Sequence, residues 1–313
     1  MINVNSKILI TGANGFLGRH LVEELETNGY DNILGHPGTG LIGDFRQQDY
    51  TEEYVKFRRP DCIIHLAARV GGIGANQMYP GQFIYENLIM GANLVEAARK
   101  SNVSKFISMG TVCMYPKFTT VPFKEEDLWC GYPEETNAPY GIAKKTLMEL
   151  IHAYRKQYEF NGITLIPTNL YGPGDNFNDA TSHVIPALIK KIKKAVENNS
   201  KEVVVWGSGS PTREFLYVKD CARAIRLAME NYSEDAPVNI GTGQEIAIKD
   251  LVLKIRAAMG FSGEVVFDTS KPDGQPRRCL NVDRAKQFGF EAQVSLDDGL
   301  KKTIDWYKDF IRI

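Results

Sequence analysis

The sequence predicts an α/β protein built on a doubly wound parallel sheet. Three features indicate this fold: short buried strands alternate with long amphipathic helices, a glycine-rich turn follows the first strand, and the chain is long enough to bury a large core. It has 313 residues, 43% of them hydrophobic, so we expect one main domain with a smaller appended lobe. Repeated β-α units place ligands beyond the carboxyl ends of the strands.

The first strand is expected at Lys7-Ile-Leu-Ile-Thr11, because this apolar run is short and rich in β-branched residues. It leads into Gly12-Ala-Asn-Gly15-Phe-Leu-Gly18 and then a helical pattern over 19–29. Glycines at this spacing tighten the turn, let the backbone approach a pyrophosphate and let the helix pack on the strand. Strand, glycines and helix in this order predict dinucleotide binding.

The alternation continues along the chain. We expect a buried strand over 62–68, a long amphipathic helix over 81–101 and a further strand over 105–109. The last of these strands ends at Gly110-Thr111. Thr111 therefore lies where a catalytic hydroxyl is expected, just beyond the carboxyl end of a strand.

The domain boundary is expected within residues 172–178, which are rich in Gly, Pro, Asp and Asn. We predict that residues 1–174 form a Rossmann domain and that residues 215–247 return to it. Residues 175–214 and 248–313 are expected to form the smaller, substrate-binding lobe.

Tyr140 and Lys144 are the first candidates for chemistry. They are four residues apart in a helical pattern and so share one helix face. The ammonium of Lys144 would favour the phenolate of Tyr140, bringing a pKa that is ordinarily about 10 closer to neutral pH, where proton transfer is efficient. Alone, this spacing is weak evidence, but it accompanies a dinucleotide-binding pattern.

Composition excludes several classes of partner. The formal net charge is −1, so the chain has no excess of positive charge that would attract nucleic acid or an anionic membrane. No apolar stretch approaches the roughly 20 residues that cross a bilayer, and no signal-peptide pattern opens the chain. Five cysteines without paired spacing favour a reducing, cytoplasmic compartment. No cluster of His, Cys and carboxylates has metal-ligand spacing, so no metal is expected.

Five features occur together in this chain: the glycine turn, His65-Leu-Ala-Ala68, Asn87, Thr111 and Tyr140-x3-Lys144. The combination resembles the extended short-chain dehydrogenases/reductases that act on nucleotide sugars. Further segments narrow the resemblance to the GDP-L-fucose synthases, which are GDP-4-keto-6-deoxymannose 3,5-epimerase/4-reductases, over nearly the whole chain. These segments are 69–76, 113–116, 167–173, 175–177, 182–187, 205–209 and 213–215.

This resemblance implies the cofactor NADP(H), a GDP-4-keto sugar substrate and a homodimer. It implies catalytic roles for Thr111, Tyr140 and Lys144 in reduction, and for Cys113 and His183 as base and acid in epimerisation. The implied cofactor contacts are Gly12, Asn14, Gly15, Phe16, Leu17, Gly18, Ala67, Ala68, Asn87, Tyr140, Lys144, Asn169 and His183. The implied substrate contacts are Asn169, Lys191, Trp206, Arg213, Lys271 and Arg278.

Cys113 and His183 suit epimerisation chemically. A 4-keto group acidifies the hydrogens at C3 and C5, so inversion needs one group to remove a proton and another to deliver one to the opposite face. A thiolate and an imidazole can both work near neutral pH. His65, within a buried strand, is interpreted as a structural histidine instead.

The chain departs from the family pattern at a few positions. Asn14 stands where the family commonly has a basic residue for the NADP 2′-phosphate. No Asp or Glu follows the strand expected over 32–36, where an NAD enzyme would bind the ribose. NADP is therefore favoured, with Arg46 or His36 as substitute contacts. Thr111 replaces the usual Ser, and Lys191 replaces Arg.

Three alternatives stay open. The protein could be a C4-reductase that leaves epimerisation to another enzyme and acts on a GDP-4-keto heptose. It could be a nucleotide-sugar 4-epimerase with tightly held NAD. It could also be a non-enzymatic NADP(H) sensor, although a sensor has no need of the acid formed by Tyr140 and Lys144.

Overall fold

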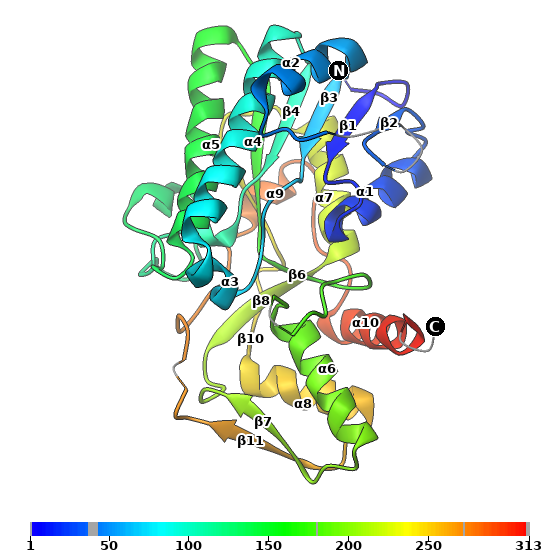
Figure 1. The fold of residues 1–313 in the computed structure, drawn as a ribbon, viewed down its shortest axis with the longest axis vertical. Coiled ribbons are helices and arrows are strands. Elements are labelled where there is room, and N and C mark those ends of the chain that lie inside the picture. The colour runs from blue at the N-terminus through cyan, green and yellow to red at the C-terminus, as the bar shows by residue number, and fades with distance from the viewer. Residues whose placement is uncertain (1, 37–42, 180, 272, 311–313) are drawn as a thin grey trace.

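The computed structural model describes residues 2–36, 43–179, 181–271 and 273–310. Its larger part, in the upper half of Figure 1, is built on a parallel sheet. This sheet has six strands in the order β2-β1-β3-β4-β5-β9. The strand order changes direction at β1, so the crevice beyond the carboxyl ends of β1 and β3 is where ligands bind in such sheets. The predicted α/β fold with a doubly wound sheet is confirmed. Its strands are β1 (Ile8–Thr11), β2 (Ile33–Leu34), β3 (Cys62–His65), β4 (Lys105–Met109), β5 (Gly162–Pro167) and β9 (Val238–Ile240).

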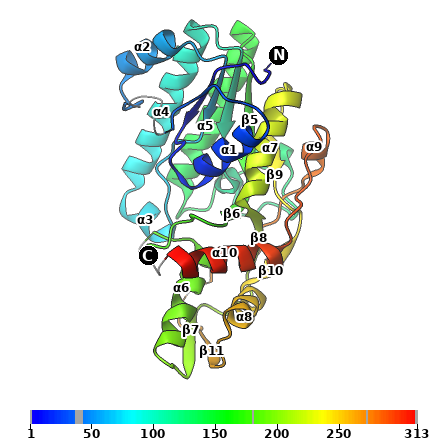
Figure 2. The ribbon, with the colours of Figure 1, turned by 90° about the vertical axis from the view of Figure 1, so that its right-hand side faces the viewer.

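Helices cover both faces of this sheet (Figure 2). Successive residues of a strand point to opposite faces, and β1 shows the result: Ile8 and Ile10 belong to the core beneath α1 and α7, whereas Leu9 belongs to the core beneath α2, α4 and α5. The sheet is therefore apolar on both sides, as expected for parallel strands. The helices are α1 (Phe16–Thr27), α7 (Val218–Asn231), α2 (Gln48–Arg58), α4 (Pro80–Lys100) and α5 (Ala138–Tyr158), with a short α3 (Ile73–Met78) before α4.

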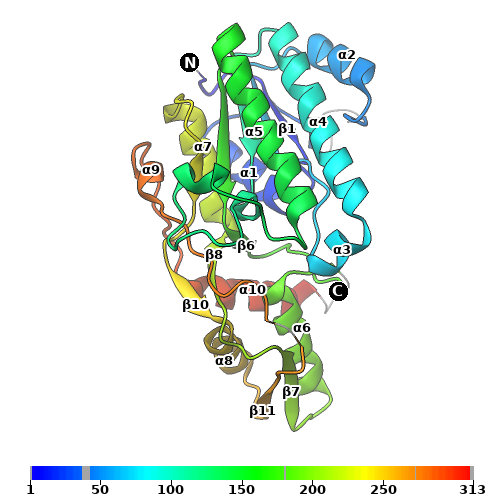
Figure 3. The same cartoon turned by 90° about the vertical axis from the view of Figure 1, so that its left-hand side faces the viewer.

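The smaller part lies below the carboxyl ends of the large sheet (Figure 3). It contains a three-stranded sheet, β10-β8-β6, and a parallel pair, β11-β7. Its own apolar core joins these strands to α6, α8 and α10. The elements are β6 (Asn169–Tyr171), α6 (Val184–Glu197), β7 (Glu202–Trp206), β8 (Thr212–Tyr217), β10 (Glu245–Ala247), α8 (Ile248–Met259), β11 (Glu264–Asp268) and α10 (Leu296–Phe310). The short α9 (Asp283–Lys286) lies beside β9.

The chain passes between the two parts more often than the predicted boundaries imply. Residues 169–171 and 215–217, which the sequence placed with the Rossmann domain, pair with each other in the three-stranded sheet. The strand β8 runs directly into α7, which packs on α1. The division into two domains remains a proposal, and its predicted boundary between residues 214 and 215 falls inside β8.

The buried carboxylate of Glu214 ties the segments below the large sheet together. It accepts hydrogen bonds from the backbone N–H groups of Gly243 (2.8 Å) and Leu280 (2.7 Å), and a third from Thr242. Burial raises the pKa of Glu214, while these backbone bonds lower it. The carboxylate thus fixes β8 against the segment that contains Arg278.

None of the helices within the described ranges is long and apolar enough to cross a membrane.

Candidate active site

The glycine turn closes tightly on the loop that follows β3. Gly12 has φ +76°, and a Cβ atom there would lie 2.8 Å from the backbone nitrogen of Ala67. A Cβ atom on Gly18 would overlap the carbonyl oxygen of Gly12, so α1 packs directly on the turn. The helix begins after Gly15 without a side-chain cap among the described residues. Its first N–H groups are therefore open to a phosphate, and the turn fits a dinucleotide.

The loop after β3 is held from two sides. Asn87 is buried, accepts from the backbone N–H of Arg69 (2.9 Å) and donates to its carbonyl (3.0 Å). On the other side, Thr11 Oγ1 accepts from the Ala67 N–H (3.2 Å) and lies 2.8 Å from His65 Nδ1. His65 is fully buried, and burial holds the pKa of its imidazole well below the usual value. These contacts support a structural role for His65 and place the predicted Ala67 and Ala68 beside the glycine turn.

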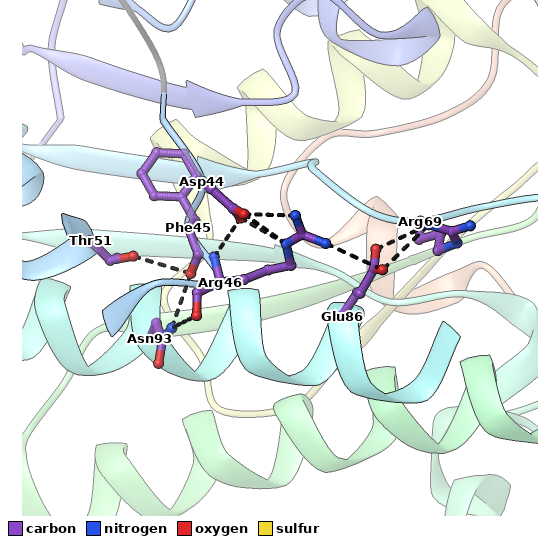
Figure 4. Close-up of polar contacts among 7 residues, drawn as sticks. All are labelled: Asp44, Phe45, Arg46, Thr51, Arg69, Glu86 and Asn93. Carbon is purple, nitrogen blue, oxygen red and sulfur yellow. Dashed lines mark hydrogen bonds and ion pairs between the residues drawn. The ribbon is translucent and has the colours of Figure 1, made fainter. Parts of the chain in front are cut away.

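Arg46, a predicted substitute contact for the 2′-phosphate, lies in a network of ion pairs (Figure 4). Its Nε donates to Asp44 Oδ1 (2.9 Å), its Nη2 donates to Asp44 Oδ2 (2.7 Å), and its Nη1 lies 3.3 Å from Glu86. Glu86 in turn pairs with Arg69 at 3.3 Å. Buried Asn93 pins the same segment by donating to the carbonyl of Arg46 (3.1 Å). Two carboxylates thus already balance the charge of Arg46, a feature that the sequence alone did not predict.

Tyr140 and Lys144 lie one turn apart on α5, as predicted. Lys144 is only 3% exposed, and burial lowers its pKa to about 8. Burial also raises the pKa of Tyr140, and the nearby thiol of Cys113 raises it further. The expectation that Lys144 lowers the Tyr140 pKa is therefore not met here, because desolvation disfavours the charged forms of both groups.

Just beyond the carboxyl end of β4, Cys113 lies on the short helix η1 (Val112–Met114), and Thr111 is the residue that precedes this helix. Thr111 caps this turn, and its Oγ1 accepts from the Cys113 N–H at 3.3 Å. Helix α5 packs on the turn so closely that a Cβ atom on Gly141 would overlap the Cys113 carbonyl oxygen. A glycine immediately after Tyr140 therefore lets the phenol and the thiol share one site.

His183 reaches the site region from the other part of the molecule. It is the N-cap residue of α6. A Cβ atom on Gly72 would lie 3.4 Å from the carbonyl oxygen of Ser182, which places this segment against the loop after β3. His183 as a whole residue is exposed, while the protein around its imidazole lowers the pKa of that ring by desolvation. Asn169, at the start of β6, donates to the carbonyl of Glu214 (2.9 Å).

The predicted substrate contacts fall into two groups. Lys191, Trp206 and Lys271 lie on the outer β7-β11 side: Trp206 is 71% exposed, the Lys271 ammonium lies 5.8 Å from its ring centre, and Lys191 donates to the Val204 carbonyl (2.8 Å). Arg213 and Arg278 form an inner group close to Cys113. Burial lowers the pKa of Arg213 to about 10, and the charge of Arg278 contributes to this shift.

Sequence reasoning missed Gln275, which joins the inner group. Its backbone carbonyl accepts from Arg213 Nη1 (2.6 Å), and its side-chain oxygen accepts from Arg278 Nε (2.7 Å). Its side-chain nitrogen donates to the carbonyl of Lys117 (2.7 Å), four residues beyond Cys113. A glutamine in a loop carries no chemical motif, so only its position between Lys271 and Arg278 could have drawn attention to it.

Residues 8–241 match the family described as NAD dependent epimerase/dehydratase. The chain belongs to this family. A GDP-L-fucose synthase from Sinorhizobium fredii is 41% identical over 305 residues, which cover 97% of this chain and 95% of that protein. The predicted resemblance to the fucose synthases within the epimerase/dehydratase family is confirmed.

Solved structures of the same fold agree with this assignment. A GDP-L-fucose synthetase from Naegleria fowleri bound to NADP superposes with a TM-score of 0.90 and 31% identity, over 100% of this chain and 95% of that chain. A GDP-mannoheptose C4 reductase from Campylobacter jejuni with NADP bound gives a TM-score of 0.88 and 33% identity, over 98% of this chain and 100% of that chain.

Proposed function

We propose that this protein reduces the C4 keto group of a GDP-linked 4-keto sugar at the expense of NADPH, after inverting C3 and C5 of the same sugar. The observation that carries the proposal is the meeting of Thr111, Cys113 and Tyr140 where β4 ends and α5 begins. A hydroxyl, a thiol and a phenol at the carboxyl end of a parallel sheet supply the groups that both steps need.

For reduction, Tyr140 would donate its proton to O4 as negative charge develops there, and Thr111 would hydrogen-bond the keto oxygen. Lys144 would hold the ribose of the cofactor. Bound NADPH would supply the hydride. The raised pKa of Tyr140 keeps the phenol protonated before reaction, which is the state that a proton donor requires.

The proposed cofactor site is the glycine turn with the loop after β3. The open N-terminus of α1 would face the diphosphate, and Gly12 and Gly18 leave the backbone free to approach it. NADP as the cofactor is supported by the two NADP-bound structures described above. To contact the 2′-phosphate, Arg46 would have to release Asp44 or Glu86, with which it is paired.

For epimerisation, Cys113 would remove a proton from the carbon next to the keto group and His183 would deliver one from the opposite face. The two residues come from different parts of the molecule, one after β4 and the other at the start of α6. A sugar bound between the two parts would therefore meet them from different sides. The GDP moiety would extend over Arg213 towards Trp206, Lys191 and Lys271.

A C4-reductase without epimerase activity, acting on a GDP-4-keto heptose, is a second candidate. The Campylobacter jejuni GDP-mannoheptose C4 reductase supports it, since its fold covers 98% of this chain. The two candidates differ in whether the hydrogens at C3 and C5 exchange with solvent.

The test is incubation with GDP-4-keto-6-deoxymannose in heavy water without NADPH, followed by NMR. Coupled epimerisation predicts deuterium at C3, C5 or both, and addition of NADPH should then give a single reduced stereoisomer. Rapid reduction at C4 with no deuterium incorporation would instead establish a reductase alone.

A further inference from the structure

The thiol of Cys113 meets a guanidinium from a distant part of the chain. Arg278 Nη1 lies 3.9 Å from Cys113 Sγ, although the two residues are 165 positions apart. We propose that Arg278, positioned by Gln275, stabilises the thiolate form of Cys113 and so makes it a competent base. The inference deepens the proposed epimerisation and rests on it for its functional meaning, but the pairing itself is testable without substrate.

The chemistry of the two groups supports this pairing. The thiolate, not the thiol, is the reactive form of cysteine, and an adjacent positive charge favours it. A guanidinium keeps its proton under all working conditions and has donors but no acceptor. Arg278 can therefore stabilise negative charge on Sγ without competing for the proton that Cys113 would remove from the sugar.

The charge of Arg278 is directed to the thiol rather than to a carboxylate. Its neighbour Arg277 pairs with Glu245, which balances that charge. Within the described ranges Arg278 makes no ion pair with an Asp or Glu. Its Nε bonds the neutral side chain of Gln275 instead, at 2.7 Å. A neutral partner orients the guanidinium and leaves its full positive charge for Cys113.

The backbone of Arg278 is fixed independently of its side chain. Its carbonyl accepts from the N–H of Glu214 in β8 (3.1 Å), and the carbonyl of Pro276 accepts from the N–H of Thr212 (2.9 Å). Gln275 then links this segment to Lys117 in the chain that follows Cys113. Substitution of the Arg278 side chain should therefore leave the segment in place.

Other groups around Cys113 do not oppose this role. Arg213 on β8 adds a second positive charge near the thiol. Tyr140 on α5 is neutral, since burial raises its pKa. Thr111 contributes only a hydroxyl, which bonds the Cys113 N–H. Among the described residues that these contacts place beside the thiol, Arg278 and Arg213 are cationic and Tyr140 and Thr111 are neutral, while the carboxylate of Asp273 acts on Arg213.

The test measures the reactivity of Cys113 with iodoacetamide at pH 7, using peptide mapping to separate it from exposed Cys130. Arg278→Gln should slow alkylation of Cys113 by about tenfold, the loss expected for one charge-assisted hydrogen bond. Arg278→Lys should restore part of the rate, and Gln275→Ala should slow it several-fold. The matched control Arg277→Gln, which removes the same charge one residue away, should react like wild type. Unchanged alkylation in Arg278→Gln, or equal slowing in Arg277→Gln, would overturn the inference.

A pH series separates stabilisation of the thiolate from structural damage. The alkylation rate of Arg278→Gln should approach that of wild type as the pH is raised to about 9, where an unassisted thiol ionises. A deficit that persists at that pH would count against the inference. If alkylation behaves as expected but wild type incorporates no deuterium from heavy water, the proposed epimerisation fails and the pairing stands.

Discussion

The site has two acid–base corners: the helix corner, formed by Tyr140 and Lys144, and the thiol corner, formed by Cys113 and Arg278. They are built in opposite ways. Tyr140 and Lys144 come from one turn of α5, and Lys144 is buried. Cys113 and Arg278 come from segments 165 residues apart and lie only partly buried. The first corner is a property of one helix, whereas the second exists only when the segment beside β8 is packed against the end of β4.

Their electrostatics differ as well. Around Tyr140 and Lys144, burial dominates: it raises the pKa of the phenol and lowers that of the ammonium to about 8. Around Cys113, two arginines bring positive charge to a partly exposed thiol. The comparison teaches that desolvation keeps the proposed proton donor protonated, while charge pairing prepares the proposed base to accept a proton.

The largest effect is expected at the helix corner. Tyr140→Phe should lower the turnover number for reduction by at least about 100-fold, because the hydroxyl supplies a proton only as charge develops on O4. The affinity for NADPH, measured by fluorescence titration, should change little. Turnover equal to wild type would show that this corner does not provide the acid.

The thiol corner can be broken separately. Cys113→Ser should reduce solvent deuterium exchange at C3 and C5 by about 100-fold or more, since a serine hydroxyl is almost wholly protonated at neutral pH. Because Tyr140 lies on a different element, the variant should still reduce an already epimerised substrate at near the wild-type rate. Simultaneous loss of both activities would mean that the two corners are not independent.

The inner and outer groups of predicted substrate contacts, represented by Arg213 and Lys191, should differ in how much they contribute to binding of the GDP-sugar. Arg213→Ala should weaken binding of GDP-sugar by about tenfold or more, as expected for a charge-assisted contact in a desolvated position. Lys191→Ala, which removes an exposed charge, should change the dissociation constant by only about two- to fivefold. Isothermal titration calorimetry with both variants measures the difference, and equal effects would contradict the distinction between the two groups.

The pH dependence of cofactor use is a graded test of the helix corner. The pKa of Lys144 is lowered to about 8 by burial, so its cation is present below that pH and is lost as the pH rises through it. The kcat/KM for NADPH should therefore decline above about pH 8, by up to about tenfold per pH unit. Lys144→Arg, which stays charged, should move the decline to higher pH, whereas the control Lys145→Arg should not. An unmoved decline would assign it to another group.

Local pattern predicted much of the fold. The expected strand over 105–109 is β4, and the helix expected over 81–101 is α4, at residues 80–100. The three-stranded β6-β8-β10 sheet was not foreseen, because its strands are short and pair across long stretches of chain. Arg46 and Glu86 are also far apart in the chain, so their ion pair could not be predicted from local pattern.

The sequence by itself determined the doubly wound sheet, the glycine turn and the spacing of Tyr140 and Lys144, because hydrophobic periodicity, backbone freedom at glycine and the helical repeat act within a few residues. Only the tertiary structure decided which charges surround each proposed catalytic group. Gln275 carries no motif, yet its side-chain oxygen accepts a hydrogen bond from Arg278, whose Nη1 lies against Cys113. The direction of the Tyr140 pKa likewise followed from burial, which depends on how the whole chain packs and not on the residue four positions away.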